Sequence, residues 1–336
     1  MIRHFKKIVL LGLLISIVVV VDAWQVLHAP LNISEPVDFE FSMGASSTTL
    51  AKQLVQRGWL TKPYYFSYWT RISGASHKLK AGEYVIEPDT TPLQLLEQMQ
   101  QGKVKLYTVT LIEGKTFQDV LTRIQASPDI KQTLQGKPVA EIMAAIGHAG
   151  ENPEGLFYPD TYSFPRGMDD VMFLQRAYNT MQRKLNNAWV SRDAGLPFVT
   201  PYEALIMASI VEKETAQASE RKQIAGVFIN RLRIGMRLQT DPTVIYGMGL
   251  DFDGNIRVKD LQRDTPYNTY TRKGLPPTPI AMPGIDAIDA VLHPDTTPYL
   301  FFVARGDRSG RHIFSVNNAQ HEAAVDQYQR KKKQKK

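Results

Sequence analysis

The sequence predicts an α+β protein with a membrane-anchor helix at its N-terminus. The 336 residues are enough for about two domains with cores of their own. The run Ile8–Val21 is almost purely apolar, which is typical of a membrane-spanning helix. From Asp38 onward, short strands, glycine turns and capped amphipathic helices follow one another, as in small α+β domains. Further along, the segment Thr200–Thr215 predicts a capped apolar helix with two glutamates at its end.

Charge and composition exclude several classes of protein. The net charge is +7, but residues 1–7 and the tail 330–336 supply nine basic residues and no acid. The rest of the chain holds 31 basic and 33 acidic residues, so we expect no nucleic-acid partner. There are no cysteines, and the seven histidines show no HExxH or similar spacing. We therefore expect no disulfide, no thiol nucleophile, no metal site and no cofactor.

The N-terminal segment predicts that the body of the chain is exported. Basic residues precede the apolar run, and Asp22 and Trp24 follow it. A span over 8–27 matches the roughly 20 residues that a bilayer requires, with Trp24 as an aromatic anchor near the outer interface. Basic residues before the span place residues 1–7 in the cytoplasm and the rest in the periplasm. We expect a single-pass protein of the cytoplasmic (inner) membrane.

A cleavable signal peptide is the alternative for this segment. Val21–Ala23 has small or apolar residues at the positions that a signal peptidase favours. The anchor is the preferred interpretation, because the apolar run is long for a signal core and resumes at Trp24–Leu27. Residues 28–37 then form an extended linker.

The segment after the linker repeats one small unit. Each copy comprises a short strand, a glycine turn, a serine or threonine cap and an amphipathic helix. The three copies are strand Phe39–Met43 with helix 47–57, strand Glu83–Glu87 with helix Pro92–Gln101, and strand Leu106–Ile112 with helix Phe117–Gln125. A further helix is predicted over Tyr64–Ile72. Such units often bind extended ligands, but a spacer that holds the rest of the chain off the membrane is an equal alternative.

Helices are predicted for most of 136–196, with an aromatic loop, Glu154–Phe164, among them. The loop interleaves aromatic residues with Pro159 and Asp160, so it cannot form a clean helix or strand. It could line a sugar-binding groove, and a turn with buried rings is the alternative. Beyond residue 216 the sequence predicts helices over 219–235, Asp286–His293 and Ala319–Tyr328, and strands over Tyr299–Ala304 and His312–Ser315.

Glu214 is the candidate for acid–base chemistry. Thr200, Pro201 and Glu203 open its helix as N-cap, first helical residue and third residue of a capping box. On a helical wheel Glu214 falls at the centre of the apolar arc, whereas Glu212 falls outside it. An apolar neighbourhood raises the pKa of a carboxyl group, as a proton donor near neutral pH requires. The alternative is a glutamate at a helix end that reaches water.

Six motifs carry a resemblance to a known family. They are Glu154–Thr161, Ala208–Thr215, Phe228–Leu232, Gln239–Tyr246, Tyr267–Tyr270 and Gly274–Pro277. In these motifs and their order the chain resembles the membrane-bound endolytic murein transglycosylases, the MltG or YceG-like family. The resemblance covers nearly the whole chain and is densest over 203–284. Thr278 departs from it, because the family more usually has glycine there, and this affects the expected path of the loop.

The resemblance implies a domain order and a site. It implies a LysM-like domain over 38–105, a YceG-like α+β catalytic domain over 106–328 and a basic tail over 329–336, which we expect to be disordered. The family's catalytic glutamate maps onto Glu214, in agreement with the helical wheel. The substrate-binding residues implied are Gln239, Asp241, Tyr246, Tyr267, Asn268 and Tyr270.

The implied reaction is lytic transglycosylation of peptidoglycan. Such an enzyme cuts the bond between N-acetylmuramic acid (MurNAc) and N-acetylglucosamine (GlcNAc) without water, because the muramyl C6 hydroxyl attacks its own C1 and leaves a 1,6-anhydro end. Well-oriented intramolecular attack has an effective molarity on the order of 10⁵ M or more, so a single carboxyl group suffices. The implied partners are peptidoglycan glycan strands and cell-wall synthases (penicillin-binding proteins), with a role in terminating or trimming nascent strands during cell-wall elongation.

Two other functions stay open at this point. A muramidase would use water, with Asp241 as its second carboxylate, although Pro242 favours a turn there. Asp241 within roughly 10 Å of Glu214 would keep that possibility open. A non-catalytic scaffold that binds peptidoglycan and organises synthases would instead leave Glu214 in solvent, away from any groove.

Overall fold

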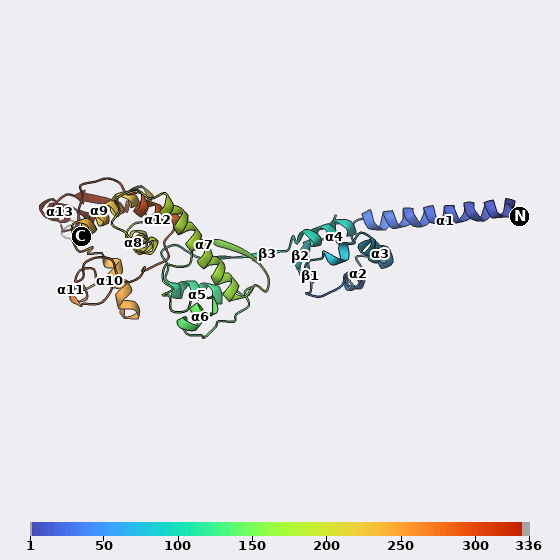
Figure 1. Cartoon of the computed structure of the whole chain (residues 1–336), viewed down its shortest axis with the longest axis horizontal. Helices are drawn as coiled ribbons and strands as arrows, with labels where there is room; N and C mark the ends of the chain where they lie inside the picture. The colour runs from blue at the N-terminus through green and yellow to red at the C-terminus, as the bar shows by residue number, and fades with distance from the viewer. Residues whose placement is uncertain (1, 331–336) are drawn as a thin grey trace. The chain divides into compact units, whose positions relative to one another are not determined.

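The computed structural model describes residues 2–330, and the chain divides into two compact units (Figure 1). Within the described residues, unit 1 comprises 2–107 with 163–167, and unit 2 comprises 108–162 with 168–330. Most of the basic tail predicted to be disordered, residues 331–336, lies outside the described residues. The prediction was wrong for its first two residues, which belong to the closing helical turn η4 (Asp326–Arg330).

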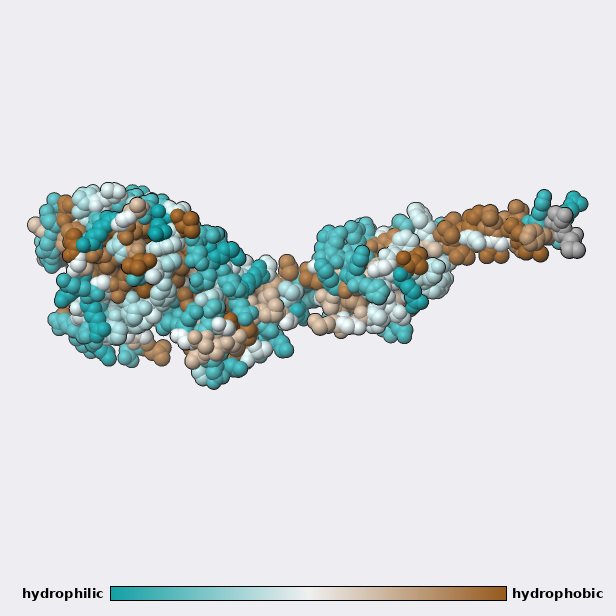
Figure 2. Space-filling view, viewed as in Figure 1, coloured by the Kyte–Doolittle hydropathy of each residue, from teal (hydrophilic) through white to brown (hydrophobic). Residues whose placement is uncertain are grey.

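The apolar N-terminal run forms one continuous helix, α1 (Ile2–His28). At 1.5 Å per residue this helix is about 40 Å long, more than the thickness of a bilayer's hydrocarbon core. The stretch Arg3–His28 is long and apolar enough to cross a membrane. Figure 2 shows the apolar surface of α1 in brown, exposed over most of its length. Burial begins at Asp22, and Leu27 packs into the core of unit 1.

Unit 1 is built around a two-stranded ribbon. Strand β1 (Val37–Phe41) pairs antiparallel with β2 (Gly82–Ile86), with Phe39 opposite Tyr84. Alternate side chains of both strands are buried, as expected for a ribbon with one covered face. The helices that complete the unit are α2 (Ser47–Gln56), α3 (Pro63–Ile72), α4 (Pro92–Gln101) and the short turn η1 (Ala75–His77).

The predicted helices of unit 1 are confirmed, and the first strand is shifted. The side chains of Ser46 and Thr91 cap α2 and α4, which explains why these starts could be predicted. The first strand ends at Phe41 because residues 42–44 form a turn, with Gly44 at a φ of 79°. Helix α3 begins at its proline, as expected of that residue in a first helical turn.

The third copy of the strand–helix unit does not extend this ribbon. Its strand β3 (Leu106–Thr110) pairs with β4 (Thr161–Pro165). Tyr162 and Phe164 of β4 are buried and their neighbours are not, which is the period of a half-buried strand. The prediction that the aromatic loop 154–164 contains no strand was therefore wrong for its last residues.

Unit 2 is mainly helical and centred on α8. Its longer helices are α5 (Phe117–Gln125), α6 (Val139–Ala145), α7 (Asp170–Val190), α8 (Pro201–Glu214), α9 (Arg221–Arg233) and α12 (Ile285–Leu292), with the turn η2 (Ala218–Glu220) before α9. Helices α7, α9 and α12 pack against α8. Strand β5 (Phe301–Ala304) pairs antiparallel with β6 (His312–Ser315), and α13 (Asn318–Val325) packs on both strands.

Helix α8 is buried all round over residues 204–211. The apolar arc of the helical wheel therefore has no solvent-exposed counterpart, as is typical of the central helix of a domain. The predicted N-cap is confirmed, since Thr200 Oγ1 accepts a hydrogen bond from the backbone of Glu203 at 3.2 Å. The carboxylate of Glu203 reaches the backbone N–H of Val199 at 2.5 Å, one residue earlier than a capping box requires.

The segment after α9 contains helices that the sequence analysis did not predict. They are α10 (Asp241–Met248), the turn η3 (Gly249–Asp251) and α11 (Val258–Gln262). Asp241 is the first residue of α10, and Pro242 lies in the first helical turn, where a missing N–H is tolerated. The prediction of an isolated turn at Asp241–Pro242 was wrong for this reason.

Candidate active site

A groove in unit 2 lies where the end of α8 meets the start of α10, the ribbon β5–β6 and α13. Its volume is about 510 Å³, within the roughly 300–1,000 Å³ range of small-ligand sites. It is lined by Glu214, Arg231, Gln239, Asp241, Tyr270, Phe301–Ala304, His312, Asn318, His321, Glu322, Val325 and Gln329. The structure thus brings Glu214 together with three of the six residues predicted to bind substrate.

Glu214 is the last residue of α8 and lines the groove. The hydroxyl of Thr240 donates a hydrogen bond to its Oε1. Burial raises the pKa of the Glu214 carboxyl above its ordinary value; the Thr240 hydrogen bond opposes this shift, and the charge of Asp241 adds to it. The group therefore keeps its proton to a higher pH than an exposed glutamate, as a proton donor near neutral pH requires.

Asp241 places a second carboxylate on the same groove. The hydroxyl of Tyr270 donates a hydrogen bond to its Oδ1 at 2.6 Å. Burial and the charge of Asp241 raise the pKa of Tyr270, so this phenol stays protonated. The pair presents an anion and a fixed hydroxyl to any ligand in the groove.

Gln239 reaches the groove from a constrained backbone position. Its φ is 50°, in the left-handed region that non-glycine residues rarely adopt. Its N–H donates to the carbonyl of Thr269 at 3.2 Å, and the next N–H, of Thr240, donates to Thr269 Oγ1 at 3.1 Å. These bonds hold the turn that brings both Gln239 and the Thr240 hydroxyl to Glu214. Strained conformations of this kind are concentrated at functional sites.

Comparison with known proteins identifies the family. Residues 39–327 match the YceG-like family over most of the chain. The chain belongs to the YceG-like family. The resemblance inferred from the six sequence motifs is confirmed.

Relatives of this YceG-like chain carry one name. A Bacillus subtilis protein named endolytic murein transglycosylase is 29% identical over 311 residues, which are 87% of this chain and 84% of that protein. A Streptococcus pneumoniae protein of the same name is 26% identical over 318 residues, covering 85% of this chain and 57% of the longer relative. The crystal structure of a YceG-like protein from Listeria monocytogenes matches with a TM-score of 0.53 and 30% identity. That match covers 87% of this chain and 99% of the Listeria chain, and it supports the mixed α+β fold.

The groove of this YceG-like chain also contains residues that the sequence analysis did not select. Arg231 is buried, and its guanidinium donates to the carbonyls of Leu300 at 2.6 Å and Leu238 at 2.5 Å. His312, on β6, lines the same groove, with Nδ1 2.8 Å from Glu220 Oε2. Arg231 lies within the motif Phe228–Leu232, so its position was visible in the sequence. Nothing local marks His312, since residues 92 positions apart form the pair.

Asn268 does not line the groove. It is 1% exposed, and its amide nitrogen donates to three backbone carbonyls of the segment 260–263. Its Oδ1 accepts the N–H of Tyr270 at 2.8 Å. The side chain fixes the loop that carries Tyr270, so its influence on the groove is indirect.

Tyr246 contacts a different carboxyl group, that of Glu154, and Tyr267 packs against Tyr246. The hydroxyl of Tyr246 donates to Glu154 Oε2 at 3.1 Å, and the two tyrosine rings meet edge to face at 4.8 Å. Glu154 also accepts the N–H of Phe117 at 3.1 Å. Burial raises the pKa of Glu154 to about 7. Thr278, the departure from the family pattern, shares a hydrogen bond of 2.9 Å with the hydroxyl of Tyr267.

The aromatic loop that follows Glu154 lies inside the protein. Leu156, Phe157 and Tyr158 are buried, and none of them lines the groove. A Cβ on Gly155 would come within 2.4 Å of Pro279, so this glycine permits close packing against the loop 274–284. The loop forms a turn with buried rings. Within residues 2–330, no cluster of three or more histidine, aspartate and glutamate side chains could hold a metal ion.

Proposed function

We propose that this chain is a membrane-anchored lytic transglycosylase that cuts MurNAc–GlcNAc bonds within peptidoglycan strands, with Glu214 as its acid and base. The observation that carries the proposal is that Glu214 lines a ligand-sized groove and that burial raises the pKa of its carboxyl group. The shared name of the relatives, endolytic murein transglycosylase, supports the substrate class. The non-catalytic scaffold is disfavoured, because Glu214 faces a groove and not bulk solvent.

One carboxyl group can serve both halves of the reaction. Protonated Glu214 donates its proton to the glycosidic oxygen as the bond from C1 to that oxygen breaks. The muramyl C6 oxygen then forms a bond to C1, and its proton passes to the Glu214 carboxylate. The enzyme ends protonated as it began, and the products are a free GlcNAc hydroxyl and a 1,6-anhydromuramyl end.

The remaining residues of the groove would bind and polarise the glycan. The Gln239 amide and the Tyr270 hydroxyl suit sugar hydroxyl and N-acetyl groups. Asp241 would stabilise the positive charge that develops at C1 and, by its own charge, favour the protonated form of Glu214. Tyr246, Tyr267 and Asn268 would act from outside the groove by holding its walls.

A water-using muramidase is the second candidate, because Asp241 lines the same groove as Glu214. The two reactions differ by one water in the product. Purified protein would be incubated with sacculi, and the intact masses of the released muropeptides would be measured. Anhydromuramyl ends are expected. Predominantly reducing muramyl ends would overturn the transglycosylase and favour the muramidase, with Asp241 as base.

We also propose separate roles for helix α1 and for the rest of unit 1. Helix α1 would anchor the chain in the inner membrane, with its N-terminus in the cytoplasm and both units in the periplasm. An uncleaved N-terminus, read by mass spectrometry of the membrane fraction, is the expected result. A mature chain that begins near Trp24 would show a signal peptide instead.

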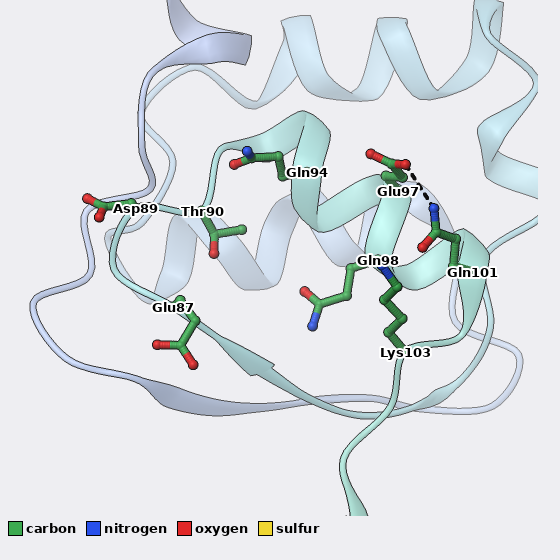
Figure 3. A pocket seen from close by; sticks show the side chains of 8 residues that line it. All are labelled: Glu87, Asp89, Thr90, Gln94, Glu97, Gln98, Gln101 and Lys103. Atoms are coloured by element: carbon green, nitrogen blue, oxygen red, sulfur yellow. Dashed lines mark hydrogen bonds between the residues drawn. The ribbon is translucent and has the colours of Figure 1, made fainter.

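The two helices α2 and α3 between the antiparallel strands β1 and β2 support a LysM-like unit for binding glycan strands. A second hollow, of about 440 Å³, lies along α4 (Figure 3). It presents amides and carboxylates that could bind sugars. Its residues are Glu87, Asp89, Thr90, Gln94, Glu97, Gln98, Gln101 and Lys103. Cell-wall synthases are the protein partners that this function would require.

A further inference from the structure

One face of α3 is apolar and exposed. The opposite face places Phe66 and Thr70 in the core of unit 1. The exposed side chains are Tyr64 at 57%, Tyr68 at 67%, Trp69 at 39% and Ile72 at 58%, and we call this set the α3 face. A surface helix of a soluble domain normally turns polar side chains to water. A contiguous exposed apolar surface of this kind marks a site of interaction.

Helix α1 is tied to the start of α3. Lys62, the residue before α3, donates to both carboxylate oxygens of Asp22 at 2.6 and 2.8 Å. The hydroxyl of Tyr65 donates to the same carboxylate at 2.8 Å. Around the helix axis Tyr68, Ile72, Tyr65 and Trp69 lie at about 40°, 80°, 100° and 140° from Tyr64. Tyr65 thus reaches α1 from within the arc of the α3 face, so this face adjoins α1.

Asp22, the residue of α1 that binds Lys62 and Tyr65, lies where the exposed apolar part of α1 ends. Val21 is the last residue of the apolar run, Asp22 follows it, and Trp24 is exposed about half a turn further on. Tyrosine and tryptophan are enriched at the headgroup level of membranes because their rings are amphipathic. The pairing with Lys62 compensates the charge of Asp22 at that depth. The α3 face therefore begins at the level of α1 where headgroups would lie.

We propose that the α3 face lies in the headgroup layer of the outer leaflet, beside the span formed by α1. The proposal rests on the proposed anchoring role of α1. A lipid surface is the occupant that the structure favours, because the α3 face is continuous with α1 and rich in tyrosine and tryptophan. The exposed Arg71, next to Ile72, suits anionic headgroups.

The absence of cysteine allows a direct test, since each introduced cysteine is then unique. Full-length Tyr68→Cys and Ile72→Cys variants would carry a nitroxide label in nanodiscs of phosphatidylethanolamine and phosphatidylglycerol. Trp24→Cys reports the anchor, and Val199→Cys, at an exposed position in unit 2, is the aqueous control. Collision rates with oxygen and with a water-soluble nickel complex give the depth of each label.

The labels at Tyr68 and Ile72 are expected to show an oxygen-to-nickel ratio severalfold above that at Val199 and close to that at Trp24. If the ratios at both positions match that of the Val199 label while the Trp24 label stays in lipid, the proposed position of the α3 face in the headgroup layer is wrong. The proposed anchoring role of α1 is then still supported. A protein partner would then be the remaining occupant of the α3 face. If the Trp24 label is also aqueous, the anchor is wrong and the docking fails with it.

Discussion

Two carboxyl groups of unit 2, those of Glu154 and Glu214, have a pKa raised by burial but lie in different settings. Glu154 is 5% exposed and accepts hydrogen bonds from the N–H of Phe117 and the hydroxyl of Tyr246. It joins three segments that are far apart in the sequence. Glu214 accepts a hydrogen bond from Thr240. Glu154 is not among the residues that line the groove, whereas Glu214 is one of them.

The difference shows that a raised pKa does not by itself identify a catalytic group. Both shifts have burial as their largest cause. Structural carboxyl groups and catalytic ones share this property, so the pKa is at most a probabilistic guide. Glu214 differs from Glu154 because it lines a groove that also contains binding groups. Glu154 is held inside the protein by hydrogen bonds, so we expect it to affect stability. Variants of the two residues can separate these roles.

The largest effect is expected for Glu214→Gln. The amide has the size of the acid but cannot transfer a proton, so glycan cleavage should fall by about 10²–10⁴-fold. Muropeptide release from sacculi by the purified variant measures this loss. Circular dichroism should show an unchanged fold. If the variant cleaves glycan at a rate only a few times lower than the native rate, Glu214 is not the catalytic acid.

The next effect concerns Glu154→Gln and the pH dependence of stability. The pKa of Glu154 is about 7 in the folded chain against 4.5 for the free group. Because the folded pKa is raised, the stabilisation is complete below about pH 4.5 and is lost as the pH rises through about 7. The native chain should therefore lose about 3 kcal/mol more unfolding free energy than the variant between about pH 4 and pH 8.

Urea unfolding of both proteins at the two pH values measures this difference. Comparing the two proteins cancels the titration of the other groups. Glycan cleavage by Glu154→Gln should stay near the native rate at acidic pH. A pH dependence of stability identical in both proteins would show that Glu154 is not buried in solution as the structure has it.

The sequence predicted best those elements whose causes are local. Helices Pro92–Gln101 and Phe117–Gln125 have the predicted bounds, because threonine caps and apolar spacing define them within a few residues. The strand His312–Ser315 was also predicted with its observed bounds. Helix α10 was missed because a proline was interpreted as a turn, although proline also starts helices.

The site was predictable only in part, because some motif residues line the groove and others hold the loops around it. Glu214, Gln239, Asp241 and Tyr270 share the groove, as the motifs implied. Asn268 comes from the same motif as Tyr270 but is used inside the protein, and a sequence does not show which way a polar side chain points. The helical wheel also assumed one apolar face, whereas α8 is buried on all sides over residues 204–211.

A smaller effect is expected for Asp241→Asn. If water is not a reactant, Asp241 contributes through its charge, and its removal should lower the rate by roughly tenfold. The pKa of Glu214 should fall, since the Asp241 charge helps to raise it, so the alkaline limb of the pH–rate profile should move to lower pH. A loss as large as that of Glu214→Gln would instead favour the muramidase.

The smallest effect is expected for Glu212→Gln, two residues from Glu214 on the same helix. Burial raises the pKa of Glu212 too, so the two residues differ in contacts more than in environment. Glu212 Oε2 accepts the N–H of Gly284 at 3.1 Å, and Oε1 lies 3.7 Å from the guanidinium of Arg221. An amide oxygen can still accept that N–H, so only the long ion pair is lost.

Glu212→Gln should therefore cost about 0.5–1.5 kcal/mol of unfolding free energy and leave glycan cleavage within about threefold of the native rate. Urea unfolding and muropeptide release, measured beside Glu214→Gln in one series, provide the comparison. The series tests the choice of Glu214 directly, because both variants replace a buried carboxyl group of α8 by an amide of equal size. An inactive Glu212→Gln variant beside an active Glu214→Gln variant would show that Glu212 is the catalytic acid. Its carboxylate would then have to give up its hydrogen bond with the N–H of Gly284 in order to contact the substrate.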